Sequence, residues 1–178
     1  MSGRSFSRHG DAIRASFEAV EVELLRSTRD QLREALERRD PDDPVVQRLF
    51  PTAVLGDAEA NAELRDLLAD DLLAGRLAGL DALVELLDRG KVHRGKLQLE
   101  LTDDEPLLVL GVLNDLRLAI GARIDIESLD RDTIDADDPM AYRLAVMDHL
   151  AWLQEQLLAI VDPPSVRYAS EVDPEDLT

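Results

Sequence analysis

The sequence predicts a mainly α (α+β) fold: a helical bundle around one central apolar helix, with a small sheet from two short hairpins. Of the 178 residues, 45% are hydrophobic but only 3% are aromatic, so Leu, Ala, Val and Ile must build the core. Apolar residues recur at helical spacing, and two short stretches alternate around turns. We expect residues 1–161 to form one helical domain, and the acidic residues 162–178 to form a flexible tail.

The first part of the chain is predicted to form a hairpin followed by two helices. Residues 5–17 contain two alternating stretches around the turn at residues 9–11. Apolar spacing then predicts a helix over residues 19–38, which ends before a proline-containing segment. Pro44 opens a short helical turn over residues 45–49.

A long helix is predicted after Asp57, which we interpret as its N-cap, and it runs to Leu87 with Gly90 as a stop. Two apolar seams indicate that neighbours pack on two sides of this helix. The first seam consists of Leu73, Leu77, Leu80, Val84 and Leu87, and the second of Leu64, Leu68, Leu72, Leu83 and Leu86. Gly75 and Gly79 lie four residues apart, a spacing that favours close approach of a neighbouring helix.

A second hairpin and two further helices complete the predicted domain. Residues 92–101 have a turn and alternating leucines, and Thr102 with Glu105 is predicted to form a capping box. The helix over residues 107–120 is apolar nearly all round, as expected for the central helix. The last helix is predicted over residues 139–161, and its core stripe consists of Val146, Leu150, Leu153, Leu157 and Ile160.

The chain contains an internal similarity, because residues 13–36 align without a gap with residues 97–120. The matched pairs are Phe17 with Leu101, Glu21 with Glu105, Leu24 with Leu108, Leu32 with Leu116, and Leu36 with Ile120. The alignment predicts two strand-turn-strand-helix units whose strands share one sheet. Chance agreement between common apolar residues is the alternative.

The sequence contains no catalytic or cofactor-binding motif that we recognise. It has no cysteine, no glycine-rich phosphate loop and no glycine-flanked serine, and its histidines have no metal-ligand spacing. His9 and His93 lie in predicted turns, whereas His149 lies one helical turn before Trp152, where we expect it to stack on the indole. We therefore predict a protein that is not an enzyme and holds no cofactor or metal.

Three polar residues interrupt the most apolar predicted helix: Asn114, Asp115 and Arg117. A buried charge is unfavourable without a partner, so these residues are expected to form a network that fixes helix register. The functional alternative is that they line a groove or an interface. The candidate residues for an interaction or structural network are Asn114, Asp115, Arg117, Arg123, His149 and Trp152.

The formal charge of −18 disfavours direct nucleic-acid binding, which usually needs a positive surface. A DNA-binding regulator remains an alternative, with Arg4, Arg8, Arg14 and Arg94 around the hairpins as its candidate contacts. No apolar run is long enough for a membrane span and no leader pattern is present, so we expect a cytoplasmic protein.

The loop before the last helix is crowded with carboxylates, which are suitable ligands for hard cations. Its aspartates are Asp130, Asp132, Asp135, Asp137 and Asp138. The loop lacks the glycine and the terminal glutamate of an EF-hand, so a solvated acidic loop is the favoured interpretation. A divalent-cation-binding protein or an enzyme that uses Asp130 to Asp138 is the alternative.

Four segments resemble an actinobacterial family long described as a domain of unknown function, whose best-known member is an oxidative-stress transcriptional regulator. The segments are Arg48-Leu49-Phe50-Pro51, Asp70-Asp71-Leu72, Leu113-Asn114-Asp115-Leu116-Arg117-Leu118-Ala119-Ile120-Gly121-Ala122-Arg123 and Leu150-Ala151-Trp152-Leu153-Gln154-Glu155. The resemblance implies a regulator that works with an alternative sigma factor of RNA polymerase during oxidative stress. The family's thiol switch cannot be carried over, because this chain has no cysteine.

Together these observations predict a non-catalytic regulatory protein that acts by protein-protein binding. We expect its surfaces to be helix faces near residues 114–123 and on the last helix, and we expect a homodimer. The negative charge would steer the protein to a basic surface on a sigma factor or on RNA polymerase.

Overall fold

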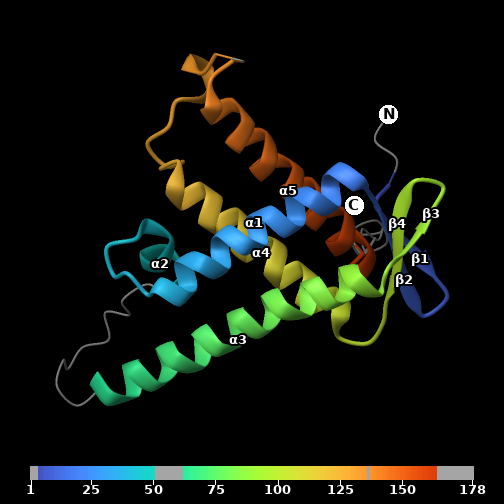
Figure 1. The fold of residues 1–178 in the computed structure, drawn as a ribbon, viewed down its shortest axis with the longest axis horizontal. Helices are drawn as coiled ribbons and strands as arrows, with labels where there is room; N and C mark the ends of the chain where they lie inside the picture. Colours follow the sequence, from blue (N-terminus) through green and yellow to red (C-terminus); the bar gives the residue numbers. More distant parts are fainter. Residues whose placement is uncertain (1–3, 51–61, 136, 164–178) are drawn as a thin grey trace, which may run out of the picture.

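The computed structural model describes residues 4–50, 62–135 and 137–163, with the backbone alone at residues 62–68 and 132. Its helices pack together beside a small sheet, which confirms the predicted α+β fold (Figure 1). In chain order the elements are β1 (Phe6–His9), β2 (Ala12–Glu18), α1 (Ala19–Arg38), α2 (Pro44–Leu49), α3 (Ala62–Arg89), β3 (Lys91–His93), β4 (Lys96–Leu101), α4 (Glu105–Arg123), the 3-10 turn η1 (Arg131–Thr133) and α5 (Pro139–Val161). The predicted tail lies outside the described residues, except for Asp162 and Pro163.

The four strands form one antiparallel sheet in the order β1-β2-β4-β3. The apolar residues of β2 and β4 alternate with polar ones, so Ile13 and Leu101, which face each other across the two strands, are both buried. Phe6 of β1 packs edge-on against Phe17, with the ring centroids 5.6 Å apart. The sheet therefore has one face on the core, as both predicted hairpins required.

The two predicted units are present, and an approximate two-fold axis relates their hairpins. Ala15 and Leu99 are equivalent in the alignment of the two units, and they are also opposite each other where β2 pairs with β4. The hairpin pairings agree as well, because His9 pairs with Ala12 in the first unit and His93 with Lys96 in the second. The antiparallel β2 and β4 place the two hairpin turns at opposite ends of the sheet.

Equivalent glutamates begin the helices of the two units. The Glu21 carboxylate accepts a hydrogen bond from Glu18 N at 2.7 Å, and the Glu105 carboxylate accepts one from Thr102 N at 2.9 Å. The predicted capping box at Thr102 is therefore only half right. The Thr102 hydroxyl lies 3.4 Å from the same Glu105 carboxylate and accepts no hydrogen bond from the helix backbone. The residue immediately before the helix is Asp104.

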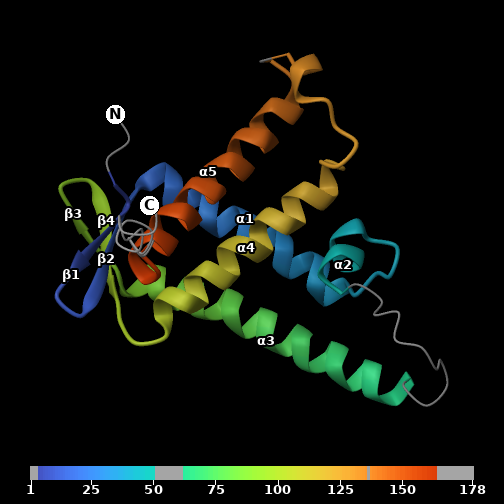
Figure 2. The ribbon, with the colours of Figure 1, turned by 180° about the vertical axis from the view of Figure 1, so that it is seen from behind.

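Helix α4 is the central helix, as predicted, because it contacts each of the other four α-helices. Figure 2 shows it crossing α1, with α3 and α5 on either side. Its buried residues are Pro106, Val109, Val112, Leu113, Leu116, Ala119 and Gly121. Helix α5 fills one side with the fully buried Leu150, Leu153 and Leu157, so the predicted core stripe of the last helix is largely confirmed.

Helix α3 has the predicted first seam, but the second seam is only partly buried. Leu83 and Leu86 are buried, whereas Leu72 is 51% exposed because no described element covers the middle of α3 on that side. The predicted start after Asp57, and the side chains of Leu64 and Leu68, lie outside what the structure describes.

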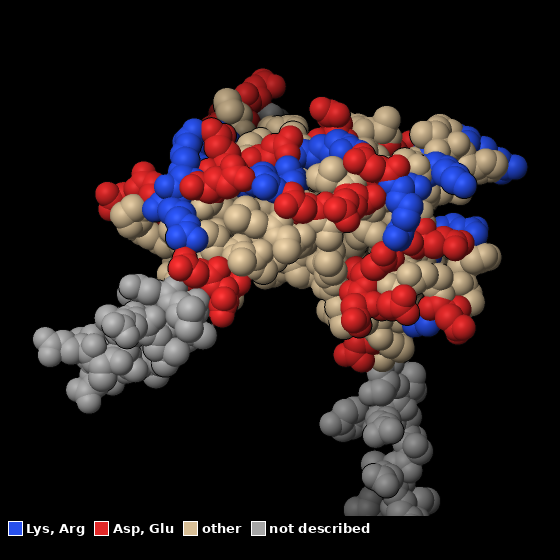
Figure 3. All heavy atoms as spheres, turned by 60° about the horizontal axis from the view of Figure 1, so that its bottom comes forward, with Lys and Arg blue, Asp and Glu red and all other residues tan. Residues whose placement is uncertain are grey.

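Ion pairs join the outer sides of α1 and α3. Arg26 and Asp88 are 2.5 Å apart, and Asp81 accepts from both Arg29 and Arg33. Figure 3 shows acidic and basic side chains alternating in a band on this side of the molecule. Because most of these groups are partly solvent-exposed, we expect each pair to contribute little to the stability of the fold.

Candidate interaction surfaces

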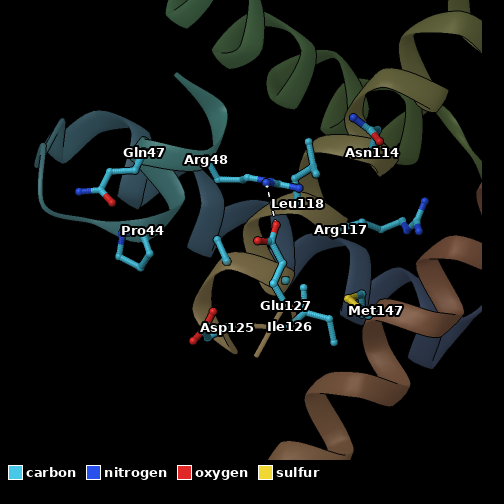
Figure 4. Close-up of a pocket in the computed structure, with 12 residues that line it drawn as sticks. Pro44, Gln47, Arg48, Asn114, Arg117, Leu118, Asp125, Ile126, Glu127 and Met147 are labelled. Carbon is cyan, nitrogen blue, oxygen red and sulfur yellow. Dashed lines mark hydrogen bonds and ion pairs between the residues drawn. The ribbon is translucent and has the colours of Figure 1, made fainter. Parts of the chain in front are cut away.

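A cleft of about 580 Å³ lies between α2, α4, the turn that follows α4, and α5 (Figure 4). Arg48 reaches from α2 to Glu127 of the turn, with Nη1 and Oε1 3.1 Å apart, as the dashed line in the figure marks. The other lining residues are Pro44, Gln47, Asn114, Arg117, Leu118, Gly121, Ala122, Asp125, Ile126 and Met147. Of the predicted site residues, the cleft thus contains Asn114 and Arg117.

Arg117 connects α4 to α5, since its Nη1 donates to Gln154 Oε1 at 2.5 Å. Its Nε atom is buried and has no hydrogen-bond partner among the described residues. The guanidinium therefore links two packed helices, and its expected role in fixing their register stays a prediction.

Asp115 points to another side of α4, where it pairs with Arg76 of α3. The Arg76 guanidinium also donates to the Leu49 carbonyl at 3.3 Å and lies 5.7 Å from the Phe50 ring centroid. One arginine thus joins α2, α3 and α4. Arg76 was not among the candidate residues predicted from the sequence, although an arginine inside the apolar stretch of α3 could have indicated it.

Arg123, at the end of α4, lies at a third location. Its Nη2 is 3.3 Å from Asp43 Oδ2, while the other oxygen of the same carboxylate accepts from Val45 N and caps α2. Arg123 also lines a cleft of about 470 Å³ between α1 and the start of α5, where Tyr142 is exposed.

His149 and Trp152 stack on α5, with ring centroids 5.4 Å apart and planes tilted by 30°, as predicted. His149 Nε2 lies 3.0 Å from Oε1 of Glu21, the glutamate at the start of α1. This contact could not be predicted from the sequence, because Glu21 and His149 approach only through the packing of α5 on the first unit. The predicted site residues therefore hold several helix contacts and do not converge on one catalytic centre.

A wide groove of about 930 Å³ lies between α3 and α4 and was not predicted from the sequence. Its lining is mainly apolar: Asp71, Leu72, Gly75, Arg76, Ala78, Gly79, Ala82, Leu107, Leu108, Gly111, Val112, Asn114 and Asp115. Seen from the α3 side, an uncharged stretch of surface lies below the charged band, and acidic side chains flank it (Figure 3). We call the groove formed by the lining residues named above the α3/α4 groove.

The two glycines of α3 have different surroundings in this groove. A Cβ atom at Gly79 would lie 3.3 Å from Val112 Cγ2, so Gly79 does allow close approach of α4, as predicted. A Cβ atom at Gly75 would have no atom within 4 Å, and the same holds for Gly111 of α4. The expectation of a packed neighbour is therefore wrong for Gly75, which borders open space.

An ion pair fastens the end of α3 to the start of α4. Arg89 donates to both carboxylate oxygens of Glu105, at 2.8 and 2.9 Å. These hydrogen bonds lower the pKa of Glu105, while partial burial acts in the opposite direction. On the sheet, the Glu18 carboxylate 2.8 Å from Lys96 Nζ raises the pKa of that amine.

The arginines proposed as DNA contacts are not gathered on one surface. Arg8 donates to the Ile160 carbonyl at 2.7 Å, and Arg14 pairs with Glu100 at 3.3 Å. Arg94 lies in the turn of the second hairpin, at the opposite end of the sheet from the first turn. Arg8 and Arg94 therefore lie near opposite ends of the sheet.

The aspartate loop is used in local contacts. Asp138 caps α5 by accepting from Met140 N at 2.7 Å, and Asp148 of α5 pairs with Arg131 of the loop at 3.2 Å. Within the residues that the structure describes, no three acidic or histidine side chains are grouped to hold a metal ion. Nor does any helix described there have the length and apolarity to cross a membrane.

Comparison with known proteins identifies both a family and named relatives. Residues 3–161 match the family described as "Domain of unknown function (DUF2017)". The chain is 30% identical over 135 residues to the "Oxidative stress regulator AosR" of Mycobacterium tuberculosis (strain ATCC 25618 / H37Rv) and to that of Mycobacterium bovis; the alignment covers 68% of this chain and 59% of each relative. A "Putative oxidative stress regulator AosR" of Mycobacterium leprae is 30% identical over 128 residues, or 66% of this chain and 58% of the relative.

The chain thus spans about three fifths of the length of these relatives. No solved structure gives a significant match. The resemblance inferred from the four sequence segments is confirmed, and the chain belongs to the DUF2017 family, whose mycobacterial relatives are named oxidative stress regulators.

Proposed function

We propose that this protein is a non-catalytic regulator of transcription in the stress response, and that it acts by binding a sigma factor or RNA polymerase. The relatives named as oxidative stress regulators support the regulatory part. The observation that supports protein binding is the α3/α4 groove, a large and mainly apolar surface that no described element covers.

The polar candidates support binding rather than catalysis. Asp115 pairs with Arg76, Arg117 with Gln154, and each contact joins two helices of the chain. Side chains engaged in this way hold the fold, whereas a reaction needs nucleophiles, acids or bases placed together around a substrate. An uncovered groove with a mainly apolar lining is the kind of surface that accepts a helix of a partner protein.

The direct test is a binding measurement with purified RNA polymerase core enzyme and with the sigma factors of the source organism. The full chain is immobilised and each protein is titrated to about 10 μM, a range that detects Kd values of weak regulatory complexes. We expect saturable binding to one of them and a change in transcript yield in vitro. Absence of binding to all of them at this concentration contradicts the proposed partner.

We also propose that the protein forms a homodimer and is located in the cytoplasm. Sedimentation equilibrium over a range of concentrations gives the oligomeric state, and cell fractionation gives the location. A chain that sediments as a monomer at every concentration contradicts self-association but leaves binding to polymerase open.

A further inference from the structure

We infer that the α3/α4 groove binds an amphipathic helix of a partner protein, whose apolar stripe has basic residues at both ends. This inference rests on the proposed function, since it names the kind of partner surface that a protein-binding regulator would recognise. It comes from the shape, the lining and the charges of the groove.

The groove has the length and the shape for a helix. Its α3 wall runs from Asp71 to Ala82, about three helical turns or 16 Å. Between the walls, the open positions at Gly75 and Gly111 leave space that no side chain of the described chain fills. Three turns of a partner helix would place apolar side chains at positions i, i+3 or i+4 and i+7 over this floor.

The walls present apolar side chains to solvent. Leu72 on α3 is 51% exposed and Leu107 on α4 is 58% exposed, and both line the groove. Leucines in these positions would be removed from water by an apolar stripe, which is the main source of affinity in helix-in-groove recognition.

The charges at both ends of the groove are acidic. Asp71 lines one end. At the other end, helical spacing places Glu85 one turn beyond Ala82 on α3, and Asp104 one turn before Leu107 on α4. Asp71, Glu85 and Asp104 are exposed and make no ion pair within the described part of the chain.

The basic residue in the lining does not balance these carboxylates. Arg76 is already paired with Asp115. An occupant with free carboxylates or phosphates at its ends would therefore meet like charge, whereas lysines or arginines there would meet opposite charge. This charge pattern favours a basic, amphipathic helix as the occupant of the groove.

The same charges argue against other occupants. A second copy would bring an equally acidic groove edge, on a chain of net charge −18. The end of this chain carries Glu171, Asp173, Glu175 and Asp176 against Arg167, so it too is acidic. A nucleic acid would bring phosphates to the same carboxylates.

The test uses two fluorescein-labelled synthetic helical peptides with the full chain. Both contain leucines at i, i+3, i+4 and i+7; one has lysines at both ends of the stripe, and the matched peptide has glutamates there. Fluorescence anisotropy should show the lysine peptide binding at least about tenfold more tightly than the glutamate peptide. Raising the salt from about 50 to about 300 mM should weaken the lysine peptide severalfold, because salt screens exposed charges.

A side chain added to the floor should block the groove. Gly111→Leu has space for the new side chain and should weaken the lysine peptide at least about tenfold by occupying its place. Ala145→Leu, at an exposed position of α5 outside the groove, is the matched control and should bind as the unmodified chain does. If circular dichroism shows that Gly111→Leu does not fold, Leu107→Ser tests the same wall.

Several results would overturn the inference. If both peptides bind equally tightly, the charge argument is wrong. If folded Gly111→Leu binds the lysine peptide as tightly as the unmodified chain does, the peptide binds elsewhere. Dimerisation of the unmodified chain that Gly111→Leu abolishes identifies a second copy as the occupant. Tighter peptide binding after deletion of residues 164–178 identifies that segment, and displacement of the peptide by an oligonucleotide identifies nucleic acid.

The proposed function and this inference can fail separately. If polymerase or a sigma factor binds the unmodified chain and folded Gly111→Leu equally well, the proposed function holds and the groove assignment is wrong. If the lysine peptide binds in the groove but neither polymerase nor any sigma factor binds, the groove assignment holds and the proposed partner is wrong.

Discussion

Alanine substitutions at Gly75 and Gly79 give a matched test of how closely α3 and α4 pack. Alanine in place of glycine inside a helix stabilises a protein by about 0.5–1 kcal/mol, because glycine loses more backbone freedom on folding. At Gly75 the new methyl group has no atom within 4 Å, so we expect the full gain. At Gly79 it would lie 3.3 Å from Val112 Cγ2, inside the usual contact distance.

We expect the crowding at Gly79 to offset or reverse the helix-propensity gain. Overpacking a well-filled contact destabilises by about 1–3 kcal/mol, so Gly79→Ala should change stability by about 0 to −2 kcal/mol. For a domain of this size, 1 kcal/mol corresponds to about 2–4 °C in Tm. The two variants should therefore differ by several degrees, with Gly75→Ala above the unmodified chain.

Chemical denaturation followed by circular dichroism and by the fluorescence of Trp152, the sole tryptophan of the chain, measures both effects. Adding Val112→Ala should relieve the crowding, so a double-mutant cycle should show a favourable coupling between Gly79→Ala and Val112→Ala. Equal stabilisation by Gly75→Ala and Gly79→Ala would refute the close approach of α4 at Gly79.

Arg89→Gln should raise the pKa of Glu105, as NMR titration would show. Because the folded-state pKa is lowered, the stabilisation is present above the carboxyl's ordinary pKa and disappears as the pH falls through the folded-state pKa, so the two proteins should converge in stability in acid. A difference in stability that stays constant with pH would contradict the ion pair. Leu150→Ala, at a fully buried position, should destabilise by about 2–5 kcal/mol in urea denaturation, and a loss below about 1 kcal/mol would contradict its core position. Arg76→Ala and Asp115→Asn should each destabilise by about 1–3 kcal/mol, and the double variant should lose less than the sum; strict additivity would exclude their pairing.

The elements of this fold were predictable where the signal is local. Apolar spacing placed helices at residues 19–38 and 139–161 with the bounds that the structure has, and turn residues located both hairpins. The alignment of residues 13–36 with residues 97–120 also predicted that the two units share one sheet. These features depend on residues that are close in the chain or on a repeated pattern.

The contacts of the candidate residues were not predictable, because they depend on how distant helices pack. Nothing within α4 indicates that Asp115 pairs with Arg76, and nothing within α5 brings His149 to Glu21. Leu72 shows the same limit, since it continues an apolar seam in the sequence but lies where α3 has no neighbour. The periodicity of apolar residues identifies a helix face that can be buried. Whether that face is buried depends on how the helices pack.

The hydrogen bonds between the N-terminal strand region and the last helix affect the order in which the chain folds. Ser5 N donates to Gln156 Oε1 at 3.0 Å, and Arg8 donates to the Ile160 carbonyl at 2.7 Å, so β1 is held by residues made some 150 positions later. A ribosome releases the hairpin of β1 and β2 long before these partners exist, and contacts so remote in sequence close late and slowly. Until α5 arrives, one edge of the sheet therefore remains a nascent-chain surface that a chaperone or a second polypeptide can reach.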